Sequence, residues 1–173
     1  MDIRLVKPEE AHKDAVLAFR KEFSDHGENV INGSEMLDKI DSYEEWLSNV
    51  TKNSDPDTVN PAWVLTDTFF ATDESGKIVG IVDLRHELKG FLKDFGHSGY
   101  SVRPSERKKG YATKMLSEIL NIAASAGLSS LILSVERSNV PSVKTIEKNG
   151  GVRERSFEYE GEPVDVYRIS LVR

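Results

Sequence analysis

Two hydrophobic periodicities alternate along this chain, and their order leaves few architectures open. Between Lys109 and Ala126 the apolar residues recur at helical spacing, so that six side chains share one face: Ala112, Met115, Leu116, Ile119, Leu120 and Ala123. Gly127 is placed to end this helix. The next segment, Leu131 to Val135, is an almost unbroken apolar run, which is typical of a strand covered on both faces. A long helix followed at once by such a strand indicates a layered domain.

The same two patterns recur through the rest of the chain. Alternating stretches predict strands and amphipathic stretches predict helices, with turns at Gly, Pro, Asn and Asp. The expected strands span 2–6, 63–71, 77–88, 95–102, 131–135, 153–159 and 164–172, and the expected helices follow Pro8 and cover 43–50, 109–126 and 140–149. This order predicts one α+β (or α/β) domain over residues 1–173, with a central, mixed, mostly antiparallel sheet of about seven strands flanked by about four helices.

The bulk properties narrow the class of function. The chain has 173 residues, 38% of them hydrophobic, which is enough for one globular core. It has no cysteine, which excludes disulfides and thiolate chemistry, and its four histidines lack paired ligand spacing, so no metal is expected. The net charge of −6 argues against a nucleic-acid partner. There is no bilayer-length apolar run and no basic-then-apolar leader, so we expect a cytoplasmic protein without a membrane partner.

A basic turn opens the long helix and carries most of the functional information. A strand that ends near Val102 passes through Arg107, Lys108 and Lys109 to Gly110, where the helix begins. The free N–H groups of a helix's first turn, together with the positive end of its macrodipole, form an anion site, and a glycine lets a phosphate approach closely. The alternative is a helix N-terminus with solvated basic residues. The Gly-x4-Gly-Lys-Ser/Thr spacing is absent, which excludes a P-loop.

The segment Arg107-Lys108-Lys109-Gly110-Tyr111-Ala112 resembles the Arg/Gln-x-x-Gly-x-Gly/Ala signature of the GNAT superfamily of N-acetyltransferases. Its context strengthens the likeness, since a Tyr100-x-Val102-x-Pro104 strand precedes it and Asn139-x-x-Ser142 follows the apolar strand. From Gly96 to Ala112 the chain reads GHSGYSVRPSERKKGYA, which is similar to a branch of predicted bacterial acetyltransferases. The resemblance covers about Ile78 to Leu171 in detail.

The resemblance implies how acetyl-CoA is held as a co-substrate. The residues implied to bind the CoA pyrophosphate, chiefly through backbone amides, are Arg107, Lys108, Lys109, Gly110, Tyr111, Ala112 and Thr113. The strand edge from Tyr100 to Val102 is implied to pair with the pantetheine arm like an added strand, and an amide there donates to the thioester oxygen. Asn139 and Ser142 are implied to contact the CoA arm or orient its thiol end.

The implied reaction is transfer of acetyl to the primary amine of a small molecule, by direct attack in a ternary complex. The polar segment 27–61 is expected to shape the acceptor side. Many family members place a tyrosine seven residues after the asparagine to protonate the thiolate, but here that position is Ile146. The substitutes considered for this acid are Tyr100, Tyr159 and Tyr167, with Ser142 acting through a water.

Candidate bases for the amine proton lie near predicted strand ends: Glu136, His97, His86 and Asp83. Glu136 follows the 131–135 strand directly, and an ordinary histidine such as His97 titrates near neutrality. The predicted catalytic residues are therefore Glu136, His97 and Tyr100. Each has an alternative interpretation. Glu136 could be a solvated charge at a strand end, His97 a structural histidine beside glycines, and Tyr100 a packing residue.

Two other functions stay open from the sequence. Because the usual tyrosine is missing, the fold could serve as an acyl-CoA-binding regulatory module without turnover, whereas a purely structural domain of this fold would have no CoA affinity. The C-terminal pair of strands offers an edge for pairing between subunits, so a homodimer is one expected assembly.

Overall fold

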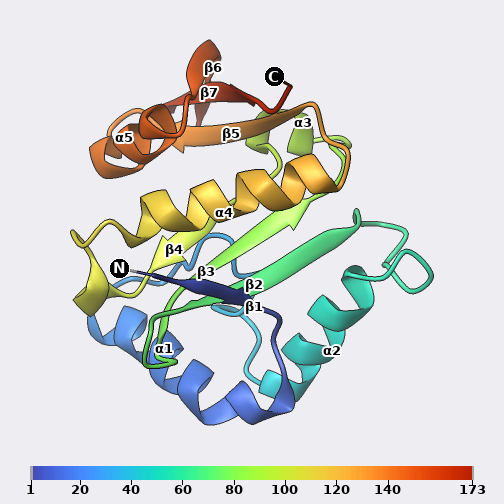
Figure 1. Cartoon of the computed structure of the whole chain (residues 1–173), viewed down its shortest axis with the longest axis vertical. Helices are drawn as coiled ribbons and strands as arrows, with labels where there is room; N and C mark the ends of the chain where they lie inside the picture. The colour runs from blue at the N-terminus through green and yellow to red at the C-terminus, as the bar shows by residue number, and fades with distance from the viewer. Residues whose placement is uncertain (1, 173) are drawn as a thin grey trace.

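The computed structural model describes residues 2–172 (Figure 1). Its strands and helices in chain order are β1 (Arg4–Val6), α1 (Lys13–Asp25), α2 (Tyr43–Asn53), β2 (Thr66–Thr72), β3 (Ile78–Arg85), α3 (Leu92–Phe95), β4 (Tyr100–Val102), α4 (Tyr111–Ser125), β5 (Ser130–Glu136), α5 (Val140–Lys148), β6 (Val152–Tyr159) and β7 (Glu162–Ser170). The predicted strands and helices are all represented, which confirms the α+β domain. Within the described residues no helix has the length and apolar character needed to span a bilayer.

The seven strands form two antiparallel sheets instead of one continuous mixed sheet. The first sheet has the order β1-β2-β3-β4 and the second the order β5-β7-β6. Between residues 2 and 172, β4 and β5 do not pair as strands, and a single bridge between Gly96 and Leu133 links the two sheets. One edge of β4 therefore stays without a neighbouring strand.

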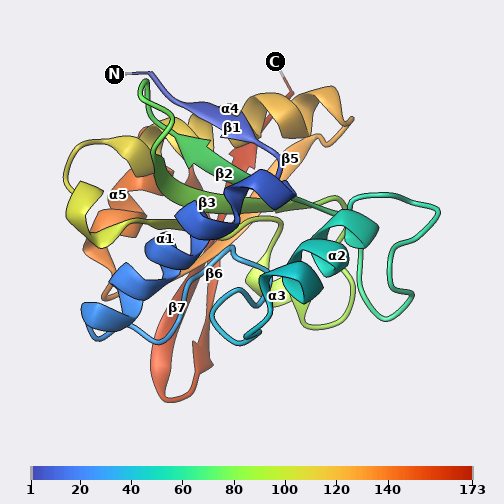
Figure 2. The same cartoon turned by 90° about the horizontal axis from the view of Figure 1, so that it is seen from below.

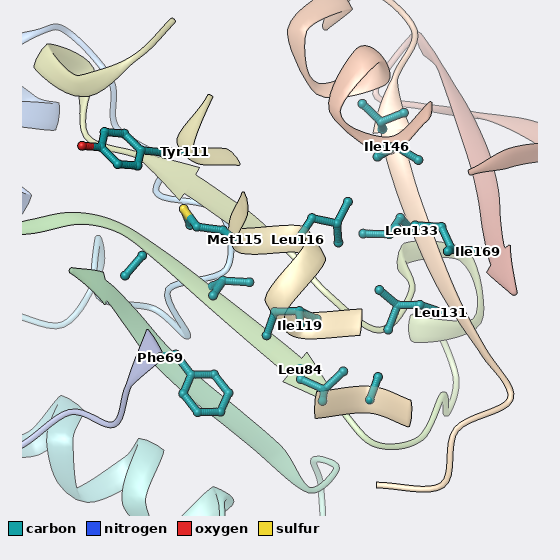
Figure 3. Packing of buried hydrophobic residues seen from close by; sticks show 14 of the residues in the cluster. Phe69, Leu84, Tyr111, Met115, Leu116, Ile119, Leu131, Leu133, Ile146 and Ile169 are labelled. Atoms are coloured by element: carbon teal, nitrogen blue, oxygen red, sulfur yellow. The ribbon is translucent and has the colours of Figure 1, made fainter. Parts of the chain in front are cut away.

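Helix α4 fills the space between the two sheets (Figure 1). Gly110 precedes it with a φ of 87°, a left-handed conformation that costs glycine little. The apolar face of α4 packs on strands of both sheets (Figure 3), and this core includes Phe69, Leu84, Tyr111, Met115, Leu116, Ile119, Leu131, Leu133 and Ile169. A Cβ at Gly80 on β3 would lie 2.7 Å from the Met115 side chain and 2.9 Å from the Ser101 carbonyl, so the lack of a side chain lets α4 lie close to the sheet.

Helices α1 and α2 cover the other face of the first sheet (Figure 2). The Trp46 indole of α2 stacks on Phe70 of β2 with ring centroids 5.8 Å apart. On β3, Ile81 belongs to this second core and Val82 to the α4 core. Because side chains alternate along a strand, the buried Asp83 shares the α1–α2 face with Ile81.

The structure corrects the start of the 95–102 strand. Residues Leu92–Phe95 form the one-turn helix α3, and only Tyr100–Val102 form β4. The reason is Gly96, which has a φ of 92°. A Cβ at this position would lie only 2.4 Å from the Ile132 carbonyl oxygen of β5, so there is no space for a side chain. The apolar strand β5 is an edge strand of its sheet, yet it is buried because α4 covers one face and residues 95–97 lie along it.

Candidate functional site

The turn between β4 and α4 presents a row of unpaired backbone amides. Lys108 and Gly110 have φ values of 64° and 87°, and these two left-handed residues bring the chain round into the helix. Within residues 2–172, the amides of residues 108–113 donate to no protein acceptor, and the first helical bond is from Lys114 N to the Gly110 carbonyl. This is the arrangement that favours an anion at a helix N-terminus.

Two carboxylates of the α1 region hold this turn in place. Glu22 accepts hydrogen bonds from Arg103 Nε and from the Ser105 amide, the latter at 2.7 Å. Burial alone would raise the pKa of Glu22, but the bonds from Ser105 and Arg103 lower it to about 2. Glu28 accepts two bonds from the Arg107 guanidinium, at 2.7 and 2.9 Å. The turn is therefore fixed by charge pairs without any ligand.

The three basic side chains of the turn differ in their surroundings. Arg107 binds Glu28, and its Nε also donates to the Val102 carbonyl at 3.1 Å. Lys109 binds Glu106 at 2.8 Å. Of these three residues, only Lys108 makes no ion pair with the part of the chain that the structure describes. Any anion at this turn would thus be bound mainly by amides and by Lys108.

The open edge of β4 lies next to these amides. The Gly99 carbonyl and the Arg103 amide bond to β3, so alternation along the strand leaves the amides of Tyr100 and Val102 facing away from it. These two amides face the side where β4 lacks a strand neighbour. The predicted CoA-binding segments, the strand edge and the turn, are therefore contiguous.

Tyr100 and the start of α5 meet at this edge. The Tyr100 hydroxyl lies 2.8 Å from Ser142 Oγ. Burial raises the pKa of Tyr100 above its ordinary value, and the hydrogen bond between its hydroxyl and Ser142 acts in the opposite direction, so the phenol is protonated at neutral pH. Asn139 caps α5 by accepting the Ser142 amide at 3.3 Å. The structure thus brings Tyr100 of β4 together with Asn139 and Ser142 at the start of α5, which the sequence analysis had named as separate candidate segments.

Ile146, which stands where many relatives have a tyrosine, is a core residue. It is 1% exposed and lies in the α4 core beside Leu133 (Figure 3). A Cβ at Gly151 would lie 2.4 Å from its Cγ2, so the space around it is filled. A larger aromatic ring at this position would have to displace part of the core.

His97 has a structural position that does not suit a base. Its Nδ1 accepts the Ile132 amide at 2.9 Å, and its own amide donates to the Ile132 carbonyl at 2.8 Å. Burial, with the nearby charge of Arg85, lowers the pKa of His97 to about 4. The ring is therefore neutral at pH 7 and its basic nitrogen is already occupied. The prediction of His97 as a catalytic base finds no support in this geometry.

The other predicted proton-transfer residues stand on different strands or follow them. Glu136 is exposed at the end of β5, opposite Val164 of β7, and its catalytic role stays a prediction. His86 is paired with Asp67 at 2.8 Å. Tyr167 is buried and Tyr159 is exposed on β6.

Sequence reasoning missed Glu35, which lies in the connection between α1 and α2. Its φ of 51° is left-handed, and its carboxyl lies against Asp83 of β3. Burial, followed by the hydrogen bond and charge of Asp83, raises the pKa of Glu35 to about 9, although Arg85 acts in the opposite direction. The only signal in the sequence is Asp83, an acid within an otherwise apolar strand.

Comparison with known proteins identifies the family and the fold of the chain. Residues 2–152 match the model of the acetyltransferase (GNAT) domain family. No curated protein sequence matches the chain significantly. Solved structures with the same fold include YncA of Salmonella typhimurium with its cofactor acetyl-CoA (TM-score 0.69, 13% identity, 98% of this chain and 94% of that one). They also include a point mutant of the spermidine N-acetyltransferase SpeG of Vibrio cholerae (0.67, 17%, 99% and 95%) and the ribosomal L7/L12 α-N-protein acetyltransferase RimL in complex with CoA (0.69, 15%, 97% and 93%).

Proposed function

Since the chain belongs to the GNAT acetyltransferase family, we propose that it transfers acetyl from acetyl-CoA to the primary amine of a small molecule, by direct attack in a ternary complex. The observation that carries this proposal is the run of unpaired amides at 108–113 beside the unpaired edge of β4. Bound acetyl-CoA supplies the acyl group as an activated thioester.

The turn and the first residues of α4 bind the pyrophosphate. The amides of residues 108–113 donate to its oxygens, and Gly110 presents no side chain to obstruct them. The charge pairs of Glu22 and Glu28 keep this cradle in its binding shape before CoA arrives, which limits the ordering cost of binding.

The open edge of β4 holds the pantetheine arm and the reacting carbonyl. The amides of Tyr100 and Val102 donate to it as they would to an added strand. One of them stabilises the oxyanion that forms on attack, a contribution of about 3 kcal/mol by comparison with other oxyanion donors. Holding the amine against the thioester contributes more, roughly 7–11 kcal/mol when orientation is good.

Tyr100 donates the proton to the departing thiolate. Its hydroxyl is protonated at neutral pH and linked to Ser142, at the N-terminus of α5. A thiol has a pKa near 8.5, so the thiolate is a good leaving group. Its protonation by Tyr100 therefore increases the rate of transfer but is not the main contribution to it. Glu136 remains the proposed acceptor of the amine proton.

Replacing Gly110 tests the pyrophosphate site. In Gly110→Val the side chain would lie among the amides, and we expect acetyl-CoA binding to weaken by at least about tenfold in calorimetric titration, as befits loss of a few amide bonds. Gly127→Val is the matched control, because Gly127 follows the other end of α4 with a φ of 91° and open space around it. It should incur a similar backbone penalty and keep its affinity. Equal affinities in the two variants would place the pyrophosphate elsewhere.

A non-catalytic acyl-CoA-binding module is the second candidate, and the buried Ile146 favours it because the usual acid is missing there. A thiol-release assay with acetyl-CoA and a broad panel of amines separates the two. Tight binding of acetyl-CoA without amine-dependent thiol release across the panel would select the module.

A further inference from the structure

Asp83 is a buried acid whose carboxylate takes a place in the hydrogen-bond ladder between β3 and β4. It is 0% exposed, and its amide donates to the Gly99 carbonyl at 3.2 Å. In a regular antiparallel pair the Gly99 amide would donate to the Asp83 carbonyl in return. Here the Gly99 amide donates to Asp83 Oδ1 at 2.7 Å, and the Asp83 carbonyl accepts the Ser98 hydroxyl at 2.7 Å. Asp83 therefore binds Gly99 on both sides of its Cα, once through the backbone and once through the side chain.

Gly99 needs this restraint because the fold requires a residue without a side chain at its position. A Cβ at Gly99 would lie 3.0 Å from the Gly33 amide nitrogen and 3.2 Å from the Gly33 Cα, since the connection between α1 and α2 lies against the strand there. Glycine has the freest backbone of all residues, so its own geometry does not fix the peptide that follows it. That peptide carries the Tyr100 amide, which faces the open edge of β4. The restraint on Gly99 therefore determines where the Tyr100 N–H points.

The groups around Asp83 hold its carboxylate in one orientation. Its Oδ2 faces the Arg85 guanidinium, with Nη2 at 3.2 Å, and the carboxyl of Glu35. Arg85 is itself fixed, because its Nη1 donates to the Gly96 carbonyl at 2.8 Å and its amide donates to the His97 carbonyl at 2.6 Å. With Oδ2 turned toward Arg85 and Glu35, the other carboxylate oxygen is directed at β4.

The residues just before Gly99 are tied to the second sheet. The His97 amide donates to the Ile132 carbonyl at 2.8 Å, and His97 Nδ1 accepts the Ile132 amide at 2.9 Å. The Ser134 hydroxyl donates to the Phe95 carbonyl at 3.0 Å. Residues 95–97 therefore bond to β5, whereas from Gly99 onward the backbone pairs with β3. Asp83 restrains the chain at the point where β4 separates from β5 and its open edge begins.

We propose that Asp83 is a positioning residue for the acetyl-CoA site, and that its carboxylate holds Gly99 so that the Tyr100 amide points at the thioester carbonyl. This rests on the proposed function, in which the open edge of β4 binds that carbonyl. The Asp83 side chain lies on the α1–α2 face of the sheet, so it acts through Gly99. Without the carboxylate, Gly99 turns more freely and the Tyr100 amide loses its fixed direction, while the amides of residues 108–113 keep theirs.

The test compares, by calorimetric titration, the affinities of acetyl-CoA and of S-ethyl-CoA, a thioether that lacks the carbonyl oxygen. One amide hydrogen bond to this oxygen should make the wild type bind acetyl-CoA about fivefold more tightly than S-ethyl-CoA. Asp83→Leu has a side chain of similar size that accepts no hydrogen bond, so we expect this ratio to fall to about one. Free CoA reports on the pyrophosphate turn separately, and its affinity should equal that of the wild type.

Asp83→Asn is the conservative variant and should keep the wild-type ratio. The new amide oxygen still accepts the Gly99 N–H, and the new NH2 group donates to Glu35, which ionises beside Arg85. Glu74→Gln, an exposed change in the β2–β3 turn, alters the net charge by the same amount as Asp83→Leu and should also keep the ratio. Asp83→Ala removes the acceptor with a smaller side chain, and it provides the same comparison if Asp83→Leu does not fold.

A purely structural role of Asp83 would lower the melting temperature of Asp83→Leu and leave the ratio at its wild-type value, and this result would overturn the proposal. Equal binding of acetyl-CoA and S-ethyl-CoA by the wild type, or loss of the ratio in Asp83→Asn, would also overturn it. If CoA does not bind to the wild type, the proposed function is contradicted and the positioning role with it. If CoA binds but the ratio is unchanged in Asp83→Leu, only the positioning role is contradicted.

Discussion

At the scale of single residues, Glu35 makes the stability of the fold depend on pH. An unfolded glutamate titrates near its ordinary pKa of 4.5, whereas the folded value is about 9. Between these values the folded state binds more protons, so the free energy of unfolding falls as pH rises through this window. We expect the wild-type melting temperature to fall between about pH 6 and pH 9 in thermal unfolding. Glu35→Gln, which cannot ionise, should lose this slope, whereas Glu74→Gln should keep it. Parallel curves for wild type and Glu35→Gln would contradict a protonated Glu35.

The proposed acid Tyr100 can be tested by replacing it with phenylalanine, which removes the hydroxyl with little change in shape. In Tyr100→Phe we expect kcat for thiol release to fall about tenfold, at the low end of general-acid effects because thiolate is a good leaving group. The affinity for acetyl-CoA should be unchanged, since the β4 amides remain. Ser142→Ala keeps the phenol and removes only its partner, so a smaller loss is expected there. A wild-type kcat in Tyr100→Phe would assign the proton to another donor.

At the scale of elements, Glu22 connects α1 to the β4–α4 turn. Its folded pKa of about 2 is below the ordinary 4.5, so the stability it contributes is present above pH 4.5 and is lost as pH falls toward 2. We expect Glu22→Gln to reduce the free energy of unfolding by about 2 kcal/mol at pH 7, as for hydrogen bonds to a charged group. Chemical denaturation measures this change in the free energy of unfolding. The affinity for acetyl-CoA should fall as well, because the β4–α4 turn is held less firmly without Glu22. A variant equal to wild type in both would show that the turn holds without this anchor.

The elements that the sequence predicted well are those with a strong local pattern. Helix α4 was expected at 109–126 and spans Tyr111–Ser125, because its apolar face and its flanking glycines are both visible in the residues. Helix α3 was missed because it is a single turn whose end at Gly96 is dictated by β5, far along the chain. Glu35 was missed because its protonation depends on burial and on Asp83, which is distant in the sequence, and no periodicity marks the segment.

At the scale of the whole molecule, the edge and the α1–α2 face of the first sheet present different polar groups. Its β4 edge and the α4 turn offer unpaired amides, while its α1–α2 face carries the buried carboxyl of Asp83, which is paired with Arg85. Gly99 joins the two, since its amide donates to Asp83 Oδ1 at 2.7 Å one residue before Tyr100.

The internal ion pairs of the turn also determine how ionic strength acts on the protein. Arg107 is paired with Glu28, and Lys109 shares Glu106 with Lys77, so a polyanionic ligand meets basic side chains that already have carboxylate partners and should displace few mobile counterions. Acetyl-CoA affinity should therefore change by no more than about threefold between about 50 and 300 mM salt, with Lys108 responsible for most of the change. Isothermal titrations along a potassium chloride series measure this slope, which Lys108→Gln should flatten. A steep dependence that survives in Lys108→Gln would mean that the two pairs open to meet the phosphates.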